Sequence, residues 1–326
     1  MKKLLQILIP LGIGLGIFVY YISGFSAKQI EEIKSAFFDV NYFWVILSLM
    51  IGFISHLIRA YRWKYLLEPI SNHPPRIHNL ILSVGISYLV NLGIPRSGEV
   101  ARAALLSKYE NMIFPRVLGT IFTERIVDMF MLGLFIVWGL FLEFSIIKQI
   151  LISVLPGNGF LFTRNLILIV ILLLSLLIVL YFSKSSLSLK IKKFLSGIIS
   201  GLLSIFKIKH IKSFIIQTLL IWASYLLMLY VVMLAFEDIS KLDLGAIILV
   251  FIVGSLSIVI SNGGIGTYPV FVTEALMLYG ISKETGFAFS LLMWTTQTLL
   301  VILFGMVSFI LLPVLNRKYP VQQSNL

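Results

Sequence analysis

The chain has 326 residues, of which 59% are hydrophobic and 12% are charged, and its mean hydropathy is +1.02. Soluble domains average about 25% charged residues, so this composition indicates an integral membrane protein. The absence of cysteine excludes disulfides, cysteine-based metal sites and a thiol nucleophile. In so apolar a chain, the net charge of +12 indicates Lys and Arg retained in cytoplasmic loops, and we expect no nucleic-acid partner.

Several apolar stretches are long enough to cross a bilayer as helices, since the hydrocarbon core requires about 20 residues. We predict full spans at residues 4–22, 42–60, 117–142, 165–182, 213–236 and 287–314. The segment 26–40 is amphipathic and is predicted to be a loop outside the cell. The second span ends in a basic and aromatic run at residues 59–64, which is typical of an anchor at the cytoplasmic face.

Two further apolar segments are interrupted by proline or glycine. Residues 77–107 break at Pro95, and residues 244–280 break at Gly263 and Gly264. The segment 183–212 contains Lys residues and no acid, so the positive-inside rule places it in the cytoplasm. This placement favours two hairpins, the first with both ends in the cytoplasm and the second with both ends outside. The hairpin arms remain open between re-entrant halves and full spans.

The sequence therefore predicts an all-α polytopic membrane protein, with residues 1–326 forming a single integral membrane domain. It has about eight membrane segments, the full spans above plus two oppositely entering broken-helix hairpins. Opposed broken hairpins are typical of an inverted-repeat transporter core. We expect the chain in the plasma (inner) membrane, with both termini in the cytoplasm.

Ionisable residues lie in and beside the first hairpin and in the span that follows. Such groups at membrane depth are costly and usually face a bundle interior or a water-filled cavity. We predict one cluster with a charge at its edge: Glu99, Arg102, Glu124, Arg125 and Asp128, with Arg96 at the edge. Two interpretations remain open, a cavity in which Arg102 and Arg125 attract a lipid phosphate, and a structural salt-bridge network.

Three motifs in this order and spacing carry a family resemblance: Asn91…Pro95-x-x-Gly98-Glu99-x-x-Arg102, Glu124-Arg125-x-x-Asp128 and Gly263-Gly264-Ile265-Gly266. They resemble the flippase-like membrane domain of lysylphosphatidylglycerol synthases, over most of the chain. The resemblance implies movement of a lipid with a charged headgroup between leaflets. The soluble aminoacyltransferase domain of full synthases is not expected here, which implies translocation without aminoacylation. Many relatives have proline before the glycine pair, where this chain has Asn262.

Asn91 of the first hairpin is also a candidate binding residue. The second hairpin supplies the remaining candidates: Asn262, Gly263, Gly264, Gly266 and Glu274. Backbone N–H groups of the glycine run at a helix N-terminus form an anion site in one interpretation and a tight turn in the other. Glu274 either pairs with an arginine of the first hairpin or carries a coupling proton. The histidines lack the i, i+4 spacing of a helical metal site, and we expect neither a metal nor a cofactor.

These features favour a lipid translocase for a phospholipid or another phosphate-bearing lipid, a transporter more than an enzyme. The expected partner is a membrane lipid, an anionic phospholipid or lipid phosphate. One alternative is a membrane-embedded transferase acting on a lipid phosphate, with a carboxylate as base. Another is a non-catalytic membrane partner of a separate lipid-modifying enzyme. The sequence leaves the oligomeric state open.

Overall fold

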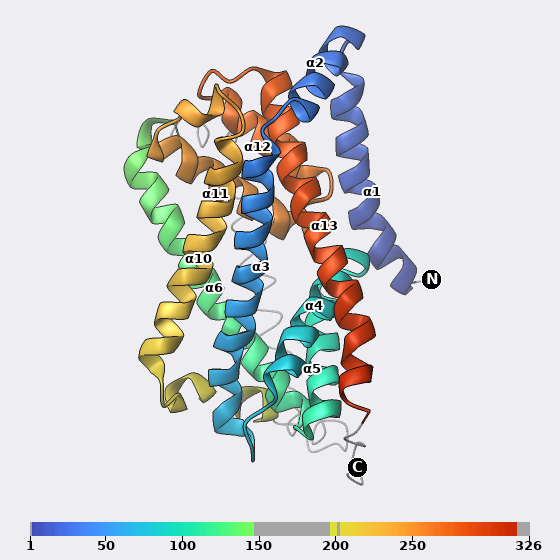
Figure 1. Cartoon of the computed structure of the whole chain (residues 1–326), viewed down its shortest axis with the longest axis vertical. Coiled ribbons are helices and arrows are strands. Elements are labelled where there is room, and N and C mark those ends of the chain that lie inside the picture. Colours follow the sequence, from blue (N-terminus) through green and yellow to red (C-terminus); the bar gives the residue numbers. More distant parts are fainter. Residues whose placement is uncertain (1, 147–195, 201–202, 318–326) are drawn as a thin grey trace, which may run out of the picture.

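A computed structural model describes residues 2–146, 196–200 and 203–317, and the described residues form helices with no strands. The elements are α1 (Lys2–Ser23), α2 (Ala27–Phe38), α3 (Tyr42–Leu67), η1 (Glu68–Ile70), α4 (Ile77–Gly93), α5 (Ser97–Glu110), α6 (Phe114–Leu142), η2 (Leu203–Lys207), α10 (Ile211–Met233), η3 (Ile239–Lys241), α11 (Leu244–Ile260), η4 (Asn262–Gly264), α12 (Thr267–Met277) and α13 (Lys283–Leu315). Figure 1 shows them as one elongated bundle. The predicted span 165–182 and half of the basic segment 183–212, residues 183–195 and 201–202, lie outside the described residues.

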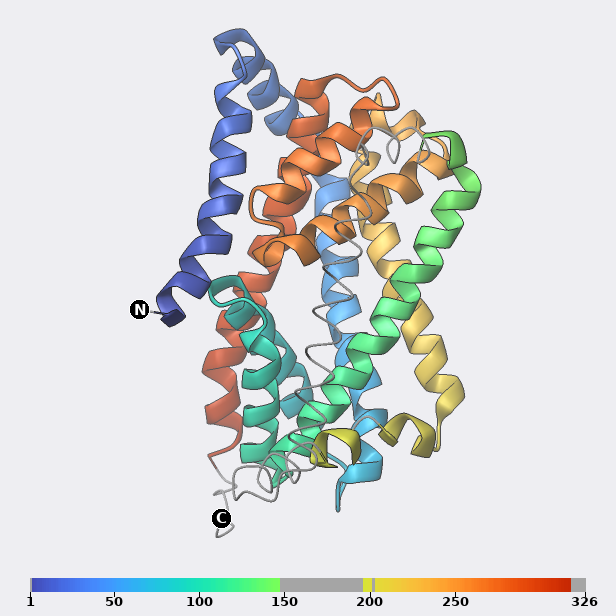
Figure 2. The same ribbon diagram turned by 180° about the vertical axis from the view of Figure 1, so that it is seen from behind.

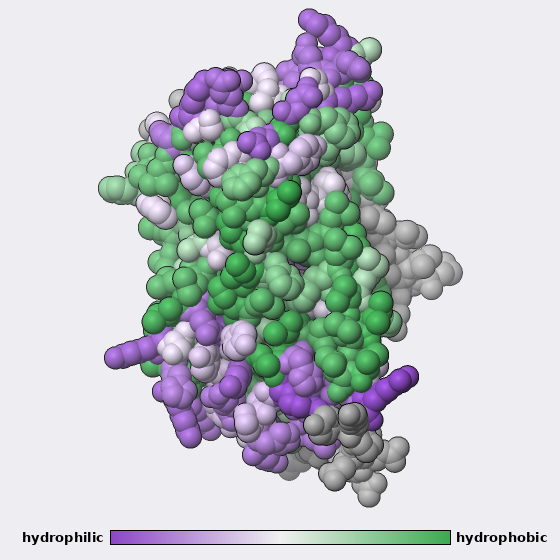
Figure 3. Space-filling view, viewed as in Figure 1, coloured by the Kyte–Doolittle hydropathy of each residue, from purple (hydrophilic) through white to green (hydrophobic). Residues whose placement is uncertain are grey.

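Four helices among the described residues are long and apolar enough to cross a membrane: Tyr42–Ile70, Phe114–Leu142, Ile211–Met233 and Lys283–Leu315. The side of the bundle seen in Figure 3 has an apolar band at mid-height between two polar ends. This pattern is the one a bilayer imposes, since the hydrocarbon core excludes unpaired polar groups. The all-helical membrane fold is therefore confirmed, while the number of spans stays a prediction.

The first predicted hairpin is a helix–turn–helix made of α4 and α5. Both helices lie in the lower half of Figures 1 and 2, side by side, and the turn between them is near mid-height. The Asn91 side-chain oxygen accepts a hydrogen bond of 2.7 Å from the Gly98 backbone N–H, which closes the turn. A Cβ atom on Gly98 would lie 2.0 Å from the Ser87 carbonyl oxygen. Only glycine at this position lets α5 pack so closely on α4.

The second hairpin is made of α11 and α12, and it descends from the opposite, upper end of the bundle (Figure 2). Its turn contains three glycines with positive φ, Gly263 at 65°, Gly264 at 76° and Gly266 at 74°. The indole N–H of Trp294 in α13 donates a 2.9 Å hydrogen bond to the Gly263 carbonyl. A Cβ on Gly263 would lie 3.3 Å from the Leu92 side chain, so the turns of the two hairpins meet inside the bundle.

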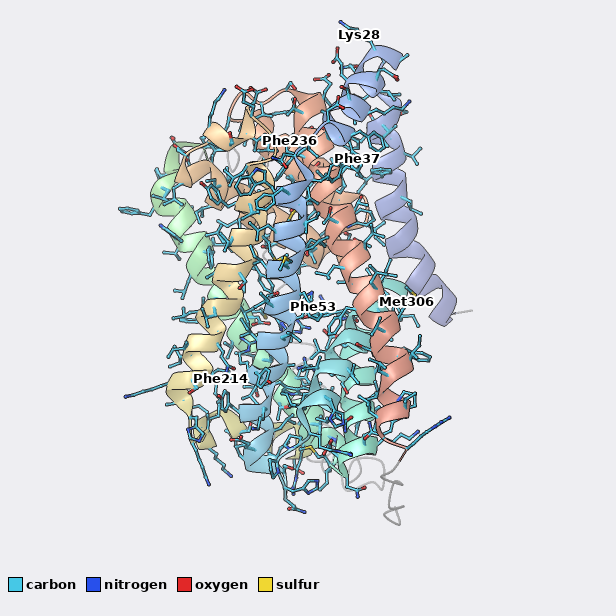
Figure 4. The ribbon with its side chains drawn as sticks, in the orientation of Figure 1. Lys28, Phe37, Phe53, Phe214, Phe236 and Met306 are labelled. Atoms are coloured by element: carbon cyan, nitrogen blue, oxygen red, sulfur yellow. The ribbon has the colours of Figure 1, made fainter. Side chains whose placement is uncertain are left out.

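Each hairpin has its own apolar core. Around the second hairpin, Ile248 and Phe251 of α11 pack with Leu276 of α12 and Phe289 of α13. A separate core surrounds the first hairpin: Trp63, Leu66, Leu80, Leu106 and Ile121, from α3, α4, α5 and α6. The side chains drawn in Figure 4 fill the space between the ribbons at both levels.

The amphipathic segment predicted as a loop at 26–40 contains a helix, α2. Ser26 caps it with a complete capping box, because its hydroxyl accepts from the Gln29 N–H and the Gln29 side chain accepts from the Ser26 N–H. The Gln29 amide also donates to Glu284 of α13, at 2.6 Å. The amphipathic pattern was therefore correct and the loop assignment was wrong, since capping and packing on α13 satisfy a helix there.

Candidate functional site

Two arginines of α3 lie inside the bundle, where the sequence indicated a surface anchor. The span predicted to end at residue 60 continues as helix to Leu67, and Leu66 and Leu67 are fully buried. Arg59 and Arg62 are buried as well, with 4% and 0% of their surface exposed. The anchor interpretation was wrong for these two residues, because their i, i+3 spacing directs both guanidinium groups toward acids on α6.

The acids on α6 are Glu124 and Asp128, which are one turn apart on the same helix face. Arg59 binds both carboxylates, with 2.9 Å between its Nη1 and the Asp128 Oδ2. Arg62 lies 3.0 Å from the Asp128 Oδ1 and 3.4 Å from the Glu124 Oε1. The Tyr225 hydroxyl of α10 accepts a further 3.0 Å hydrogen bond from Arg59. The ion pairs thus connect α3 with α6, and the Tyr225 hydrogen bond adds α10.

The α5 arm of the first hairpin adds two more ion pairs to this network. Nη1 of Arg102 lies 3.1 Å from the Glu124 Oε2. One turn earlier on α5, the Glu99 Oε1 lies 2.9 Å from Nη2 of Arg125. Glu99 and Arg102 are three residues apart, so they share the helix face that meets α6.

The arginine–carboxylate cluster is defined by these ion pairs: Arg59, Arg62, Glu99, Arg102, Glu124, Arg125 and Asp128. Four guanidinium groups and three carboxylates leave one net positive charge. Phe53, labelled near mid-height of α3 in Figure 4, precedes Arg59 by about 9 Å along the helix. Glu124 and Asp128 lie roughly 15–21 Å from the start of α6, so the cluster is well inside the apolar bundle.

One side of the cluster is open. The Arg125 side chain is 39% exposed and that of Glu99 is 20% exposed, whereas Glu124 is 1% exposed. Beside Arg125, the apolar side chains of Ile126, Met129 and Phe130 are also exposed on α6. A charged group therefore reaches the surface next to an apolar face of the same helix.

Arg102 differs from the other buried arginines in its free hydrogen-bonding edge. Its guanidinium carbon lies 3.6 Å from the ring centroid of Trp63, a stacking cation–π contact. The Trp63 indole N–H donates to the Thr120 hydroxyl at 3.0 Å, which fixes the ring against α6. Both Nε and Nη2 of Arg102 are buried and have no hydrogen-bond partner in the part of the chain that the structure describes.

The structure brings five of the predicted binding residues into the cluster, and it places the others elsewhere. Asn91 closes the turn of the first hairpin. Arg96 is exposed in that turn with a φ of 57°, and forms no ion pair within the described ranges. Gly263, Gly264 and Gly266 form the turn of the second hairpin, and the side chain of Asn262 lies outside the described residues.

Glu274 lies apart from the cluster, on the exposed side of α12. Its Oε1 accepts a 2.8 Å hydrogen bond from the Tyr21 hydroxyl of α1. In the described ranges it makes no ion pair with an arginine of the first hairpin, so the interpretation as a partner of such an arginine was wrong. The sequence allowed the pairing because it does not show that α1 packs against the second hairpin.

The chemistry of the cluster is that of an oxyanion site more than a metal site. Within residues 2–146, 196–200 and 203–317, no group of three or more His, Asp or Glu side chains is arranged to hold a metal ion. Arginine forks suit phosphate and carboxylate oxygens because their donors are planar and permanently charged. The sequence analysis did not include Arg59 and Arg62 in the cluster. Their i, i+3 spacing, followed by the apolar Leu66 and Leu67, was the pattern that could have indicated a buried pair.

Comparison with known proteins adds the family. The family model of the lysylphosphatidylglycerol synthase TM region matches residues 7–305. Searches of curated proteins and of solved structures found no match. The match covers both hairpins and every residue of the arginine–carboxylate cluster. The chain is therefore a membrane protein that belongs to the family of the lysylphosphatidylglycerol synthase TM region.

Proposed function

We propose that this protein moves a phospholipid, or another lipid with a phosphate headgroup, from one leaflet of the plasma membrane to the other. The arginine–carboxylate cluster receives the headgroup while the acyl chains stay in the bilayer. The family supports a role in lipid handling. The observation that carries the proposal is a cluster of seven ionisable side chains within an apolar helical bundle. Four of them are buried, and one side of the cluster is open.

The composition of the cluster supports a binding role. A charged side chain near the bilayer centre costs several kcal/mol, about 2.5–3.5 on insertion scales, so such groups are rare unless they serve a function. A purely structural salt-bridge network needs only equal numbers of positively and negatively charged side chains. The net positive charge of the cluster instead leaves an attraction for one anion. A lipid phosphodiester carries one negative charge and fits this balance.

The surroundings of the open side support a lipid as the carrier of that anion. Arg125 and Glu99 are the most exposed members of the cluster. Ile126, Met129 and Phe130 present apolar surface along the same helix. A lipid can place its headgroup against Arg125 while its chains lie along this apolar face, which a free anion does not require.

The opposed hairpins support movement across the bilayer. Their turns meet where Gly263 approaches Leu92, so breaks in two helical segments coincide inside the bundle. In transporters with inverted repeats, substrate sites lie between such broken helices near the midplane. Two members of the cluster, Glu99 and Arg102, lie on the α5 arm of one of these hairpins, and the proposal takes the hairpin to move with the headgroup.

The test is a leaflet-resolved translocation assay on purified protein in liposomes, using a tail-labelled phosphatidylglycerol. Arg102→Gln and Arg125→Gln should each slow translocation at least about tenfold, because a hydrogen bond to a charged group contributes ~1.5–3 kcal/mol. Arg116→Gln is the matched control, since Arg116 is exposed on α6 outside the cluster. Wild-type protein that moves no lipid faster than empty liposomes would overturn the proposal.

A further inference from the structure

The hydrogen-bond donors and acceptors left unpaired in the cluster indicate which groups its ligand must carry. Nε and Nη2 of Arg102 lie on the same edge of the guanidinium plane, so together they form a two-pronged donor. Nη1 of the same side chain faces Glu124. Both free atoms are buried and lack a hydrogen-bond partner among the residues described. An empty fork of this kind is costly, and two oxygens of one oxyanion would satisfy it.

The other buried arginines do not offer such an edge. Arg59 uses both terminal nitrogens, for the α6 carboxylates and for Tyr225. Arg62 uses both as well, for Thr218 and for Asp128. In each of these two side chains only Nε is left without a hydrogen bond in the described part of the chain. The bidentate position is therefore on Arg102.

Two carboxylate oxygens of the cluster also lack a hydrogen bond within the described ranges. One is the Glu124 Oε2, which lies 3.1 Å from Nη1 of Arg102 as an ion pair, and the other is on Glu99. The Oε2 atom of Glu99 is buried and has no hydrogen-bond partner within the described ranges, while its Oε1 faces Arg125. Glu99 and Arg102 lie one helical turn apart on α5, with roughly 5–6 Å between Cβ atoms at this spacing. A ligand that binds both the Arg102 edge and the Glu99 Oε2 must carry an oxyanion for the first and an N–H or O–H donor for the second. The spacing of the two groups matches a short headgroup.

We infer that the cluster selects phosphodiester lipids whose headgroup carries a hydrogen-bond donor. Arg102 binds the phosphate through its Nε and Nη2 atoms. Trp63 is the positioning residue that holds the Arg102 guanidinium in place. The inference rests on the proposed function for its choice of a lipid. Phosphatidylglycerol offers hydroxyls and phosphatidylethanolamine offers an ammonium group to Glu99. Phosphatidylcholine has the same phosphate but no N–H or O–H in its headgroup.

Trp63 acts through Arg102 and not on the ligand. It is fully buried, and its indole N–H is held by Thr120 of α6. The Arg102 guanidinium carbon lies 3.6 Å from the ring centroid, and this contact restrains the guanidinium. Removal of the Trp63 ring would free the Arg102 side chain to rotate. The headgroup preference should then be lost although Arg102 is still present.

The experiment measures binding of short-chain phosphatidylglycerol, phosphatidylethanolamine and phosphatidylcholine to the full chain in detergent. The two donor-bearing lipids should bind at least about tenfold more tightly than phosphatidylcholine. Arg102→Lys should remove most of this binding because lysine keeps the charge and lacks the fork. Arg116→Lys, at an exposed position of α6, is the matched control and should bind as the wild type does.

Two further variants test the role of Trp63. Trp63→Leu should abolish the preference for donor-bearing headgroups, and Trp63→Phe should restore it because a ring again faces Arg102. Trp138→Leu, at an exposed position of α6, controls for the loss of an indole elsewhere. A Trp63→Leu protein that folds and keeps the preference would overturn the positioning role.

The source of the phosphodiester is tested with glycerophosphoglycerol, the deacylated headgroup of phosphatidylglycerol. It should bind more weakly than the lipid, and equal binding would overturn the lipid assignment in favour of a soluble phosphodiester. Equal binding of all three lipids would overturn the inferred selectivity, even if translocation proceeds. Selective binding without translocation in liposomes would instead overturn the proposed function and leave the inferred binding site intact.

Discussion

The two hairpins are both helix–turn–helix units, but the first carries charged side chains in ion pairs and the turn of the second is held by neutral groups. The α4–α5 hairpin carries Glu99 and Arg102 on its second arm, both paired with charges of α6. In the α11–α12 hairpin the turn is held by neutral groups, with Ser261 and Thr267 in contact and the Thr267 hydroxyl donating to the Ser257 carbonyl at 3.1 Å. Related geometry thus serves a charged site in one hairpin and a neutral support in the other.

The difference predicts how each hairpin responds to damage. In the first hairpin, removal of a charge leaves buried partners unpaired, so loss of stability and loss of binding should occur together. In the second, the α1 backbone at Gly14 lies directly against Gly266, and steric changes should dominate. Substitutions in and around the two hairpins distinguish the loss of ion pairs from steric destabilisation, and the largest effect is expected at the ion pairs.

Glu124→Gln should have the largest effect on stability. Glu124 pairs with Arg59, Arg62 and Arg102, and its removal leaves three buried guanidinium groups with reduced compensation. Breaking a buried ion pair typically costs ~3–5 kcal/mol. The free energy of unfolding in mixed micelles measures the loss, and Glu237→Gln, on an exposed loop, is the control. An unchanged unfolding free energy would show that the cluster does not stabilise the bundle.

Gly266→Ala should destabilise the second hairpin by about 3 kcal/mol, from overpacking and from strain at positive φ. A Cβ there would lie 1.9 Å from the Gly14 carbonyl oxygen of α1, and φ is 74°. Gly280→Ala is the matched control, because its φ is 79° but nothing lies within 4 Å of the added atom. The control should lose only ~1 kcal/mol, and equal losses would mean that α1 does not press on this turn.

Gly98→Ala should cost ~1–3 kcal/mol, since its φ is ordinary and the cost comes from the clashes with the Ser87 carbonyl and the Asn91 side chain. The substitution moves α5 away from α4 and displaces Glu99 and Arg102, so translocation should also slow. Gly93→Ala, with nothing within 4 Å of its added Cβ, is the control. If the Gly98 variant translocates lipid at the wild-type rate, the position of α5 does not matter to the site.

Tyr21→Phe should have the smallest effect, about 0.5 kcal/mol. It removes the hydrogen bond to Glu274, which joins α1 to the second hairpin at an exposed position, where such bonds contribute little. Tyr20→Phe, on the exposed side of the same helix, is the control. Thermal unfolding measures both variants, and slow lipid translocation in Tyr21→Phe would instead give Glu274 a functional part.

The sequence was sufficient for much of the fold, because hydrophobic runs and their breaks determine where helices begin and end. The breaks at Pro95 and at Gly263 located both hairpin turns, and the spacing of Glu99 and Arg102 located the face of α5 that meets α6. The number of spans stays a prediction, and residues 165–182 lie outside the described part of the chain.

The sequence was insufficient where a side chain's partner comes from a distant helix. Arg59 and Arg62 follow an apolar run and stand among aromatic residues, a pattern shared by interfacial anchors and by buried cations. Only the packing of α3 on α6 distinguishes the two. Asn91 stays a candidate binding residue, and the sequence did not show that its side-chain oxygen accepts from the Gly98 N–H, because this contact depends on the return of the chain there.

The most direct measurement is native mass spectrometry of the protein released from its own membrane in mild detergent. The account predicts that the wild type retains a phospholipid with a donor-bearing headgroup and that Arg102→Gln, at equal folding, retains much less of it. Wild-type protein without bound phospholipid, or an Arg102→Gln variant that retains the same lipid to the same extent, would contradict the account.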